Sequence, residues 1–199
     1  MKTFAFLALV VGALFLYYES NAPLTYPPGV LIPAEPRQFD ASPNEVPSDF
    51  GKFHLKALAR FSIDARVLHR KRYRYDREAE LVPLDLAVGW GPMSDQAVLD
   101  RLEITQASRF FYYEYKGVPP IPRDEINSHA TNLHLIPSSK EISARCNALR
   151  SGDLIHLSGL LVEASGEGIG TWRSSLSRTD TGNGACELVW VEDVGKLSR

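Results

Sequence analysis

Residues 138–162 read SSKEISARCNALRSGDLIHLSGLLV and place a helix directly before a strand. Ser138 and Glu141 have the spacing of a capping box, which predicts that a helix begins there. Its apolar residues recur at helical spacing and form one face, made of Ile142, Cys146 and Leu149. Gly152 is placed to end this helix, because glycine adopts the left-handed conformation that helix ends favour.

The second half of the stretch predicts a bent strand. Apolar and polar residues alternate over 153–162, and Gly159 lies inside, where a missing side chain allows a barrel-type bend. Alternation at 61–68 predicts another strand, which begins near Phe53. Segments 171–178 and 185–192 complete a three-stranded meander with it.

Other patterns add short elements between these strands. Pro83 favours the first turn of a helix, and Ser94 is a good N-cap. The expected elements are helices at 84–88, 95–102 and 123–129, and strands at 109–115 and 133–136. The strand at 109–115 is aromatic on both faces, which is typical of a central strand.

These elements predict an α+β fold. We expect a mostly antiparallel, curved sheet with three or four short helices, preceded by an N-terminal apolar helix. An OB-like barrel is the specific architecture that we favour.

Composition limits the class of protein. The chain has 199 residues, 44% hydrophobic and 23% charged, which are values of a globular domain. Wholesale disorder and a multi-span membrane protein are excluded. The formal net charge of -2 provides no general basic field for nucleic acid. Two cysteines are too few for a disulfide scaffold.

The N-terminus carries an apolar segment. Residues 4–18 are apolar apart from Gly12, and Lys2 precedes them. We expect an uncleaved signal anchor over 1–20, because Pro23 follows the one small-residue cleavage pattern and would disturb an extended substrate. A cleaved signal peptide is the alternative. The positive charge at the start favours an N-in, C-out orientation.

A proline-rich linker follows the anchor. Seven of the thirteen prolines lie between Pro23 and Pro47, within 21–49, and no periodic apolar pattern accompanies them. Such a segment is an extended stalk before the soluble domain at 50–195. The alternative is an arm that packs on the domain through its few apolar side chains.

Two short polar motifs are candidates for binding. His129, Asn132 and His134 lie within six residues, and the two histidines could ligate a metal if a turn brought them together. Local contacts to the backbone are the simpler explanation. Asp180-Thr181-Gly182 matches the triplet of aspartic proteases, but those enzymes need two such carboxylates. We therefore interpret Asp180 as part of a polar hairpin tip.

A basic run with aromatic residues lies at 66–77. Six arginines and lysines occupy this segment, interleaved with Tyr73 and Tyr75. Such a run binds single-stranded nucleic acid or anionic lipid headgroups, or is a solvated strand edge that resists aggregation. An extracytoplasmic domain argues against nucleic acid.

The two cysteines allow three interpretations. Cys146 and Cys186 form one disulfide if the domain is outside the cytoplasm, or both are inert buried thiols. In the third interpretation, Cys186 is a nucleophile with a histidine as its base.

Several stretches together resemble a known group of proteins. They are RVL at 66–68, PLDLAVGWGPMSD at 83–95, HATNLHLIP at 129–137 and WRSSL at 172–176, continuing to Glu192. Over about 53–192 the chain resembles a group of bacterial envelope proteins with an N-terminal membrane segment and no established activity. The resemblance implies an inner-membrane protein whose domain faces the periplasm, or a secreted periplasmic protein if the segment is cleaved.

From these observations we expect a membrane-tethered binding or assembly module of the bacterial envelope. Its partners would be the membrane and another envelope protein, without nucleic acid, and no cofactor or metal is expected. The candidate binding residues are Trp90, His129, Asn132, His134, Trp172, Arg178 and Asp180. The alternative is an extracytoplasmic hydrolase with a His/Cys or His-metal site.

Overall fold

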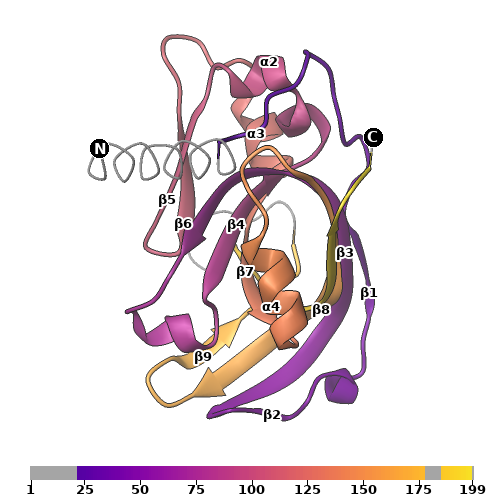
Figure 1. Ribbon diagram of the computed structural model, residues 1–199, viewed down its shortest axis with the longest axis vertical. Coiled ribbons are helices and arrows are strands. Elements are labelled where there is room, and N and C mark those ends of the chain that lie inside the picture. Colours follow the sequence, from indigo (N-terminus) through magenta and orange to yellow (C-terminus); the bar gives the residue numbers. More distant parts are fainter. Residues whose placement is uncertain (1–21, 178–184, 199) are drawn as a thin grey trace, which may run out of the picture.

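A computed structural model describes residues 22–177 and 185–198. A large curved sheet dominates it, and a two-stranded hairpin stands beside it (Figure 1). The sheet contains β1 (Arg37–Asp40), β2 (Asp49–Phe50), β3 (Phe53–Arg72), β4 (Leu84–Gly89), β7 (Ala130–Pro137), β8 (Leu154–Gly166), β9 (Gly170–Arg173) and β10 (Glu187–Lys196). The hairpin contains β5 (Glu103–Ala107) and β6 (Phe110–Glu114).

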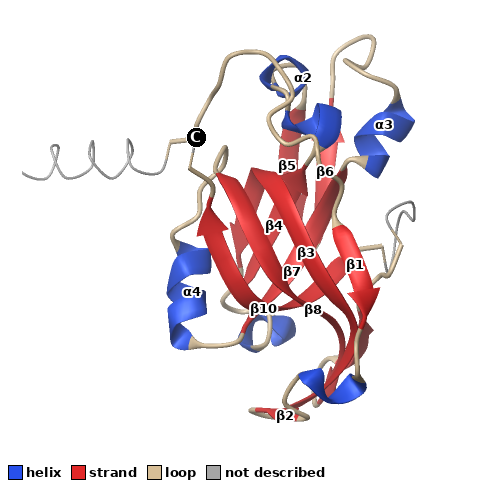
Figure 2. Ribbon diagram, turned by 90° about the vertical axis from the view of Figure 1, so that its right-hand side faces the viewer, coloured by secondary structure: helices blue, strands red, loops and turns tan. Residues whose placement is uncertain are grey.

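Short helices connect these strands in the described residues. The α-helices are α2 (Gln96–Leu99), α3 (Arg123–Ser128) and α4 (Lys140–Asn147). The 3-10 helices are η1 (Pro43–Glu45), η2 (Arg77–Glu80) and η3 (Gly91–Ser94). Figure 2 shows α2 and α3 at the end of the sheet where the hairpin stands, and α4 along one side. The predicted α+β class with a curved, mostly antiparallel sheet is confirmed.

Strand pairing makes the sheet curve back on itself. The order runs β3-β4-β7-β10-β8, and β8 also pairs with β3 from Phe53 to Arg66. Among these pairs only β7 and β10 are parallel. The sheet is therefore partly closed around an apolar interior to which all five strands contribute, with Ile63, Leu86, Leu133, Leu157 and Val189 among its buried residues.

Gly159 lies where two strands approach closely. A Cβ on Gly159 would stand 1.9 Å from the carbonyl oxygen of Trp190. The register of β10 shifts nearby, between Val191 and Asp193. Only a residue without a side chain allows this contact, which fits the bend that the sequence predicted here.

The helix predicted over 84–88 is wrong, because this segment is strand β4. All six residues of β4 are buried, and it pairs with β3 on one side and β7 on the other. A short apolar run has no periodicity that separates helix from strand, so the two neighbouring strands decide its conformation. The aromatic strand is also not central, because β6 pairs only with β5, outside the large sheet.

Residues 22–40 lie against the domain. The buried hydroxyl of Ser94 accepts the N–H groups of Leu31 and Ile32 at 3.0 Å each, and β1 pairs with β3. The guanidinium of Arg66, 3% exposed, donates to the carbonyl oxygen of Leu24 at 3.2 Å. The division of the chain at residue 49 stays a prediction.

None of the helices in the described ranges is long and apolar enough to cross a bilayer. Residues 1–21, where the anchor is predicted, lie outside those ranges.

Candidate functional site

A pair of buried polar residues lies on the outer face of β4 and β7. Asp85 and His134 stand opposite each other in the two strands, with side-chain exposures of 0% and 3%. His134 Nδ1 is 3.0 Å from Asp85 Oδ1. In a neutral imidazole this contact holds the proton on Nδ1 and leaves Nε2 as an acceptor.

Arg109 joins the hairpin to this pair. Its Nη1 donates to Asp85 Oδ1 at 3.2 Å and to the carbonyl oxygen of Val82 at 2.8 Å. Its Nε and Nη2 donate to the two carboxylate oxygens of Asp76 at 2.9 and 2.8 Å. The guanidinium carbon lies 3.6 Å from the centroid of the Tyr73 ring. Arg109 therefore holds the hairpin on the outer face of the curved sheet through charge-assisted bonds and a cation–π contact.

The turn that carries Arg109 has an uncommon backbone. Ser108 and Arg109 have φ angles of 49° and 69°, although neither is glycine. Positive φ at both central positions is typical of a tight hairpin turn. The contacts of the Arg109 side chain stabilise the turn against the cost of this conformation.

Tyr73 is a neutral part of the same network. Its hydroxyl oxygen accepts the backbone N–H of Arg109 at 3.2 Å. Burial, and then the negative charge of Asp85, raise the pKa of Tyr73 above its usual value. The phenol therefore keeps its proton at neutral pH.

Asn132 extends the network along β7. Its Nδ2 donates to the carbonyl oxygen of Arg109 at 3.1 Å, and its Oδ1 accepts from Gln106. Gln106 Oε1 in turn lies 2.9 Å from Nδ1 of His69 on β3. A continuous polar chain thus runs from β3 to the hairpin over the sheet surface.

Two adjoining pockets open beside this network. One, of about 400 Å³, lies between the aromatic face of β6 and β7 and includes Tyr113, Asn127 and Asn132. The other, of about 320 Å³, is lined by His134, Trp172 and Glu78 among others. Phe110 and Cys186 line both. The Trp172 ring lies 4.7 Å from that of His134, measured between centroids.

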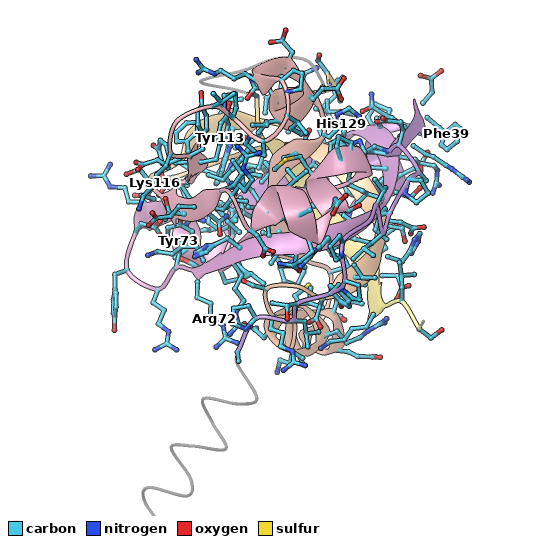
Figure 3. All side chains as sticks on the ribbon, turned by 90° about the horizontal axis from the view of Figure 1, so that it is seen from above. Phe39, Arg72, Tyr73, Tyr113, Lys116 and His129 are labelled. Atoms are coloured by element: carbon cyan, nitrogen blue, oxygen red, sulfur yellow. The ribbon has the colours of Figure 1, made fainter. Side chains whose placement is uncertain are left out.

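The predicted binding residues fall into two places. Asn132, His134 and Trp172 meet at the pockets. Trp90 and His129 form another cluster, in which Trp90 is 1% exposed and its Nε1 donates to Glu35 at 2.7 Å. Figure 3 shows His129 well away from Tyr73 of the Arg109 network. The predicted residues Arg178 and Asp180 lie outside the described residues.

The two histidines of the sequence motif do not converge. His129 Nδ1 lies 3.2 Å from Glu125 and its Nε2 lies 3.5 Å from Glu35, whereas His134 contacts Asp85. Within 22–177 and 185–198, no three His, Cys, Asp or Glu side chains are grouped so that they could hold a metal ion.

The two cysteines are not bonded to each other. Cys146 lies in the core, where burial raises the pKa of its thiol to about 12. Cys186 is partly exposed, and its Sγ is 3.9 Å from the carbonyl oxygen of Arg109. Cys186 thus shares the second pocket with His134, but not with His129.

Two arginines of the basic run at 66–77 bind the C-terminal end of α4. Arg72 Nη2 donates to the carbonyl oxygen of Asn147 at 2.7 Å, and Arg70 Nη1 donates to the same oxygen at 3.1 Å. These arginines satisfy carbonyl groups at the C-terminus of α4, where positive charge is favoured.

Sequence reasoning missed Asp85 and Arg109, the centre of the network. Asp85 is the one charged residue in an otherwise apolar strand, LDLAVG, and this contrast was an available signal. Arg109 carried no such signal, because its importance depends on a turn without glycine and on partners more than twenty residues away.

Comparisons with known proteins found no matching protein-family model, curated protein or solved structure.

Proposed function

We propose that this protein is a membrane-tethered binding module of the bacterial envelope, built on an OB-like barrel. The strand order β3-β4-β7-β10-β8, with β7 parallel to β10 and α4 between β7 and β8, supports this architecture. OB barrels bind ligands on their second and third strands, between the loops that follow the first and fourth. Here those strands are β4 and β7.

The observation that carries the proposal is the position of the polar network. Asp85 and His134 lie on β4 and β7, the strands that correspond to the ligand-binding second and third strands of an OB barrel. Tyr73 and Asp76 follow β3, and Trp172 follows β8, so the flanking loops contribute the rim. A buried network that is satisfied internally holds its side chains rigid and preorganises the surface.

Charge pairing indicates the class of ligand. Arg109 is bound by two carboxylates, and Arg173 pairs with Glu163 at 2.6 Å. A phosphate backbone requires an excess of cations over carboxylates at its site. Here Asp76, Asp85 and Glu163 outnumber the two arginines with which they pair. Aromatic rings beside neutral amides and hydroxyls suit a ligand with apolar faces and hydroxyl groups. We therefore propose an uncharged glycan chain.

The apolar segment at 1–20 would tether the module to the inner membrane, with the domain in the periplasm. A cleaved form would be a periplasmic protein with the same binding groove, by which we mean the two adjoining pockets that share Phe110 and Cys186. Tethering raises the effective concentration of the module near other envelope components, which favours an assembly role with another envelope protein.

Tryptophan fluorescence tests the groove. Trp90 and Trp190 are 1% and 6% exposed, whereas Trp172 is half-buried at the pocket, so a bound ligand changes mainly the emission of Trp172. The probe is a series of N-acetylglucosamine oligomers added to the full chain in mild detergent. We expect a saturable change that Trp172→Phe abolishes and Trp190→Phe retains.

Absence of a saturable change with these oligomers, together with saturable binding of single-stranded DNA, would overturn the proposed glycan class. A change that persists in Trp172→Phe would place the ligand elsewhere on the protein.

One observation favours a second candidate function, a thiol hydrolase. Asp85 orients His134, and Cys186 lines the same pocket as His134. In this candidate the three residues act as the orienting carboxylate, the base and the nucleophile of acyl transfer to a thiol. His134 takes the thiol proton as Cys186 attacks a carbonyl carbon. The bond to the leaving group then breaks, His134 returns the proton to that group, and water hydrolyses the resulting thioester to free the thiol. The alkylation rate of Cys186 against pH tests it. An activated thiol reacts quickly at pH 6 and slows in His134→Gln, whereas an ordinary thiol gives equal profiles in both proteins.

A further inference from the structure

The described chain begins close to one side of the barrel. The N–H of Leu24 donates to the carbonyl oxygen of Ser151 at 2.9 Å, and its own carbonyl oxygen accepts from Arg66 at 3.2 Å. Gly152, with φ of +89°, lets the arm pass, because a Cβ there would stand 2.2 Å from the oxygen of Leu24. Leu24 is therefore fixed to the turn between α4 and β8.

Little chain remains between this contact and the apolar segment. Six peptide units separate Tyr18 from Leu24. A fully extended chain advances at most about 3.6 Å per residue, so these units span no more than roughly 22 Å. If 1–20 is the membrane anchor of the proposed function, the turn at 147–153 is held within that distance of the membrane surface.

Basic side chains surround the same turn. Arg70 and Arg72 bind the carbonyl oxygen of Asn147, Lys196 lies 2.9 Å from Asp153, and Arg145 lies 2.7 Å from Asp193. Together with Arg150 there are five cations on these elements. Carboxylates also lie on these elements: Asp153 in the turn, which is 2% exposed, Glu192 and Asp193 on β10, and Asp64 and the buried Glu187 farther along β3 and β10.

Lys140 and Glu141, at the start of α4, offset each other. The side formed by α4, the turn at 147–153 and Lys196 carries four cations, Lys140, Arg145, Arg150 and Lys196, and two carboxylates, Glu141 and Asp153. It therefore has an excess of two positive charges, although the whole chain has a net charge of -2. We call it the α4 side.

The figures agree on where this side lies. Figure 2 shows α4 on the side of the molecule where the described chain begins. Figure 3 shows Arg72 on that same side, whereas Tyr73 and Tyr113 lie toward another. The proposed binding groove thus lies on a different side of the domain from the α4 side.

We propose that the α4 side rests on anionic lipid headgroups of the membrane that holds the N-terminal segment. This inference rests on the anchor in the proposed function and adds the orientation of the domain. Positive charge near an anionic surface is attracted within about one Debye length, roughly 10 Å at 0.1 M salt. The short connection allows the α4 side to approach the surface to within that range. The domain then lies with its groove parallel to the membrane plane.

The test uses the full chain reconstituted in vesicles of phosphatidylcholine with or without phosphatidylglycerol. A fluorophore is attached at Ala144→Cys on α4, or at Asn44→Cys in η1, which lies on the opposite side in Figure 2. Both carry Cys186→Ser, and Cys146 is buried and unreactive. Energy transfer to a headgroup acceptor reports the distance of each label from the membrane.

We expect stronger transfer from position 144 than from position 44 in anionic vesicles. The preference should fall by on the order of fivefold for each positive charge removed. Arg145→Gln with Lys196→Gln removes two exposed cations, and Lys52→Gln with Lys56→Gln is the matched control on β3 and its turn. Thermal unfolding verifies that each variant is folded.

Equal transfer from the two labels in anionic vesicles, or a preference that the Arg145/Lys196 variant retains, would overturn the lipid contact. The anchor has a separate readout: protein that alkaline carbonate washes from the vesicles would refute the anchor of the proposed function. Protein that resists the wash but shows equal transfer would refute only the orientation.

Discussion

Replacement of Arg109 by glutamine tests whether the polar network holds the hairpin on the curved sheet. Glutamine keeps a polar side chain of moderate length but removes the charge that faces Asp85 and Asp76. Asp85 is fully buried, so Arg109→Gln leaves a buried carboxylate whose remaining polar neighbours are His134 and Asn132. The lost contacts also include the stacking on Tyr73.

The expected loss follows from burial. Removal of one partner of a buried ion pair costs about 3 to 5 kcal/mol. Arg109 is 12% exposed and Asp76 33%, so solvent screens part of the interaction and the lower figure applies, about 3 kcal/mol. For a domain of this size, about 3 kcal/mol lowers Tm by roughly 6 to 12 °C.

Urea and thermal unfolding of the full chain in mild detergent measure this loss. The matched control is Arg173→Gln, whose pair with Glu163 has side-chain exposures of 52% and 30% and should contribute less than about 1 kcal/mol. Arg109→Gln combined with Asp85→Asn should lose about 1 to 3 kcal/mol less than the sum of the single losses, because the unpaired buried charge is gone.

Two results would refute this reasoning. One is a loss for Arg109→Gln no greater than that for Arg173→Gln. The other is additivity of the Arg109 and Asp85 losses in the double variant. Faster hydrogen exchange in β5 and β6 of Arg109→Gln is the accompanying expectation, because these strands pair only with each other.

Three further predictions concern other parts of the fold. At pH 8, Ellman's reagent should label Cys186 in the native protein and Cys146 only after unfolding. The reason is that burial raises the pKa of the Cys146 thiol to about 12 and keeps it protonated. Rapid labelling of both cysteines would contradict the packing of α4. Gly159→Ala should lower the free energy of unfolding in urea by about 3 kcal/mol, because its Cβ would meet the Trp190 carbonyl. In the control Gly195→Ala the Cβ meets only the flexible end of Arg145, so the loss should be about 0.5 kcal/mol. Equal effects would argue against the close approach of β8 and β10. Ser94→Ala removes the acceptor of two backbone N–H groups, so we expect about 2 kcal/mol of destabilisation and faster proteolysis within 25–40. An unchanged cleavage rate would show that other contacts hold residues 22–40 on the domain.

Local patterns predicted the elements whose cause is local. Helix α4 begins with Ser139 as its N-cap, one residue after the predicted start, and Ile142 and Cys146 are buried as their spacing indicated. The strand predicted from Phe53 is β3, because strict alternation allows only one face to be buried. Gly159 marked the close approach of two strands through its lack of a side chain.

The candidate site was predicted only in part. Asn132, His134 and Trp172 were singled out from their residue types, and they meet at the pockets. Trp90 and His129 were singled out by the same argument and lie in another cluster. Residue type and spacing do not contain the register of β4 against β7, which decides which side chains share a face.

Local patterns were enough to predict a curved, mostly antiparallel α+β domain, since alternation, capping and glycine placement act within a few residues. That 84–88 is a strand, and that Arg109 holds the hairpin on Asp85, became evident only in the folded arrangement. Both depend on partners distant in sequence, and a short buried run or an isolated arginine gains its conformation from those partners rather than from its own neighbours.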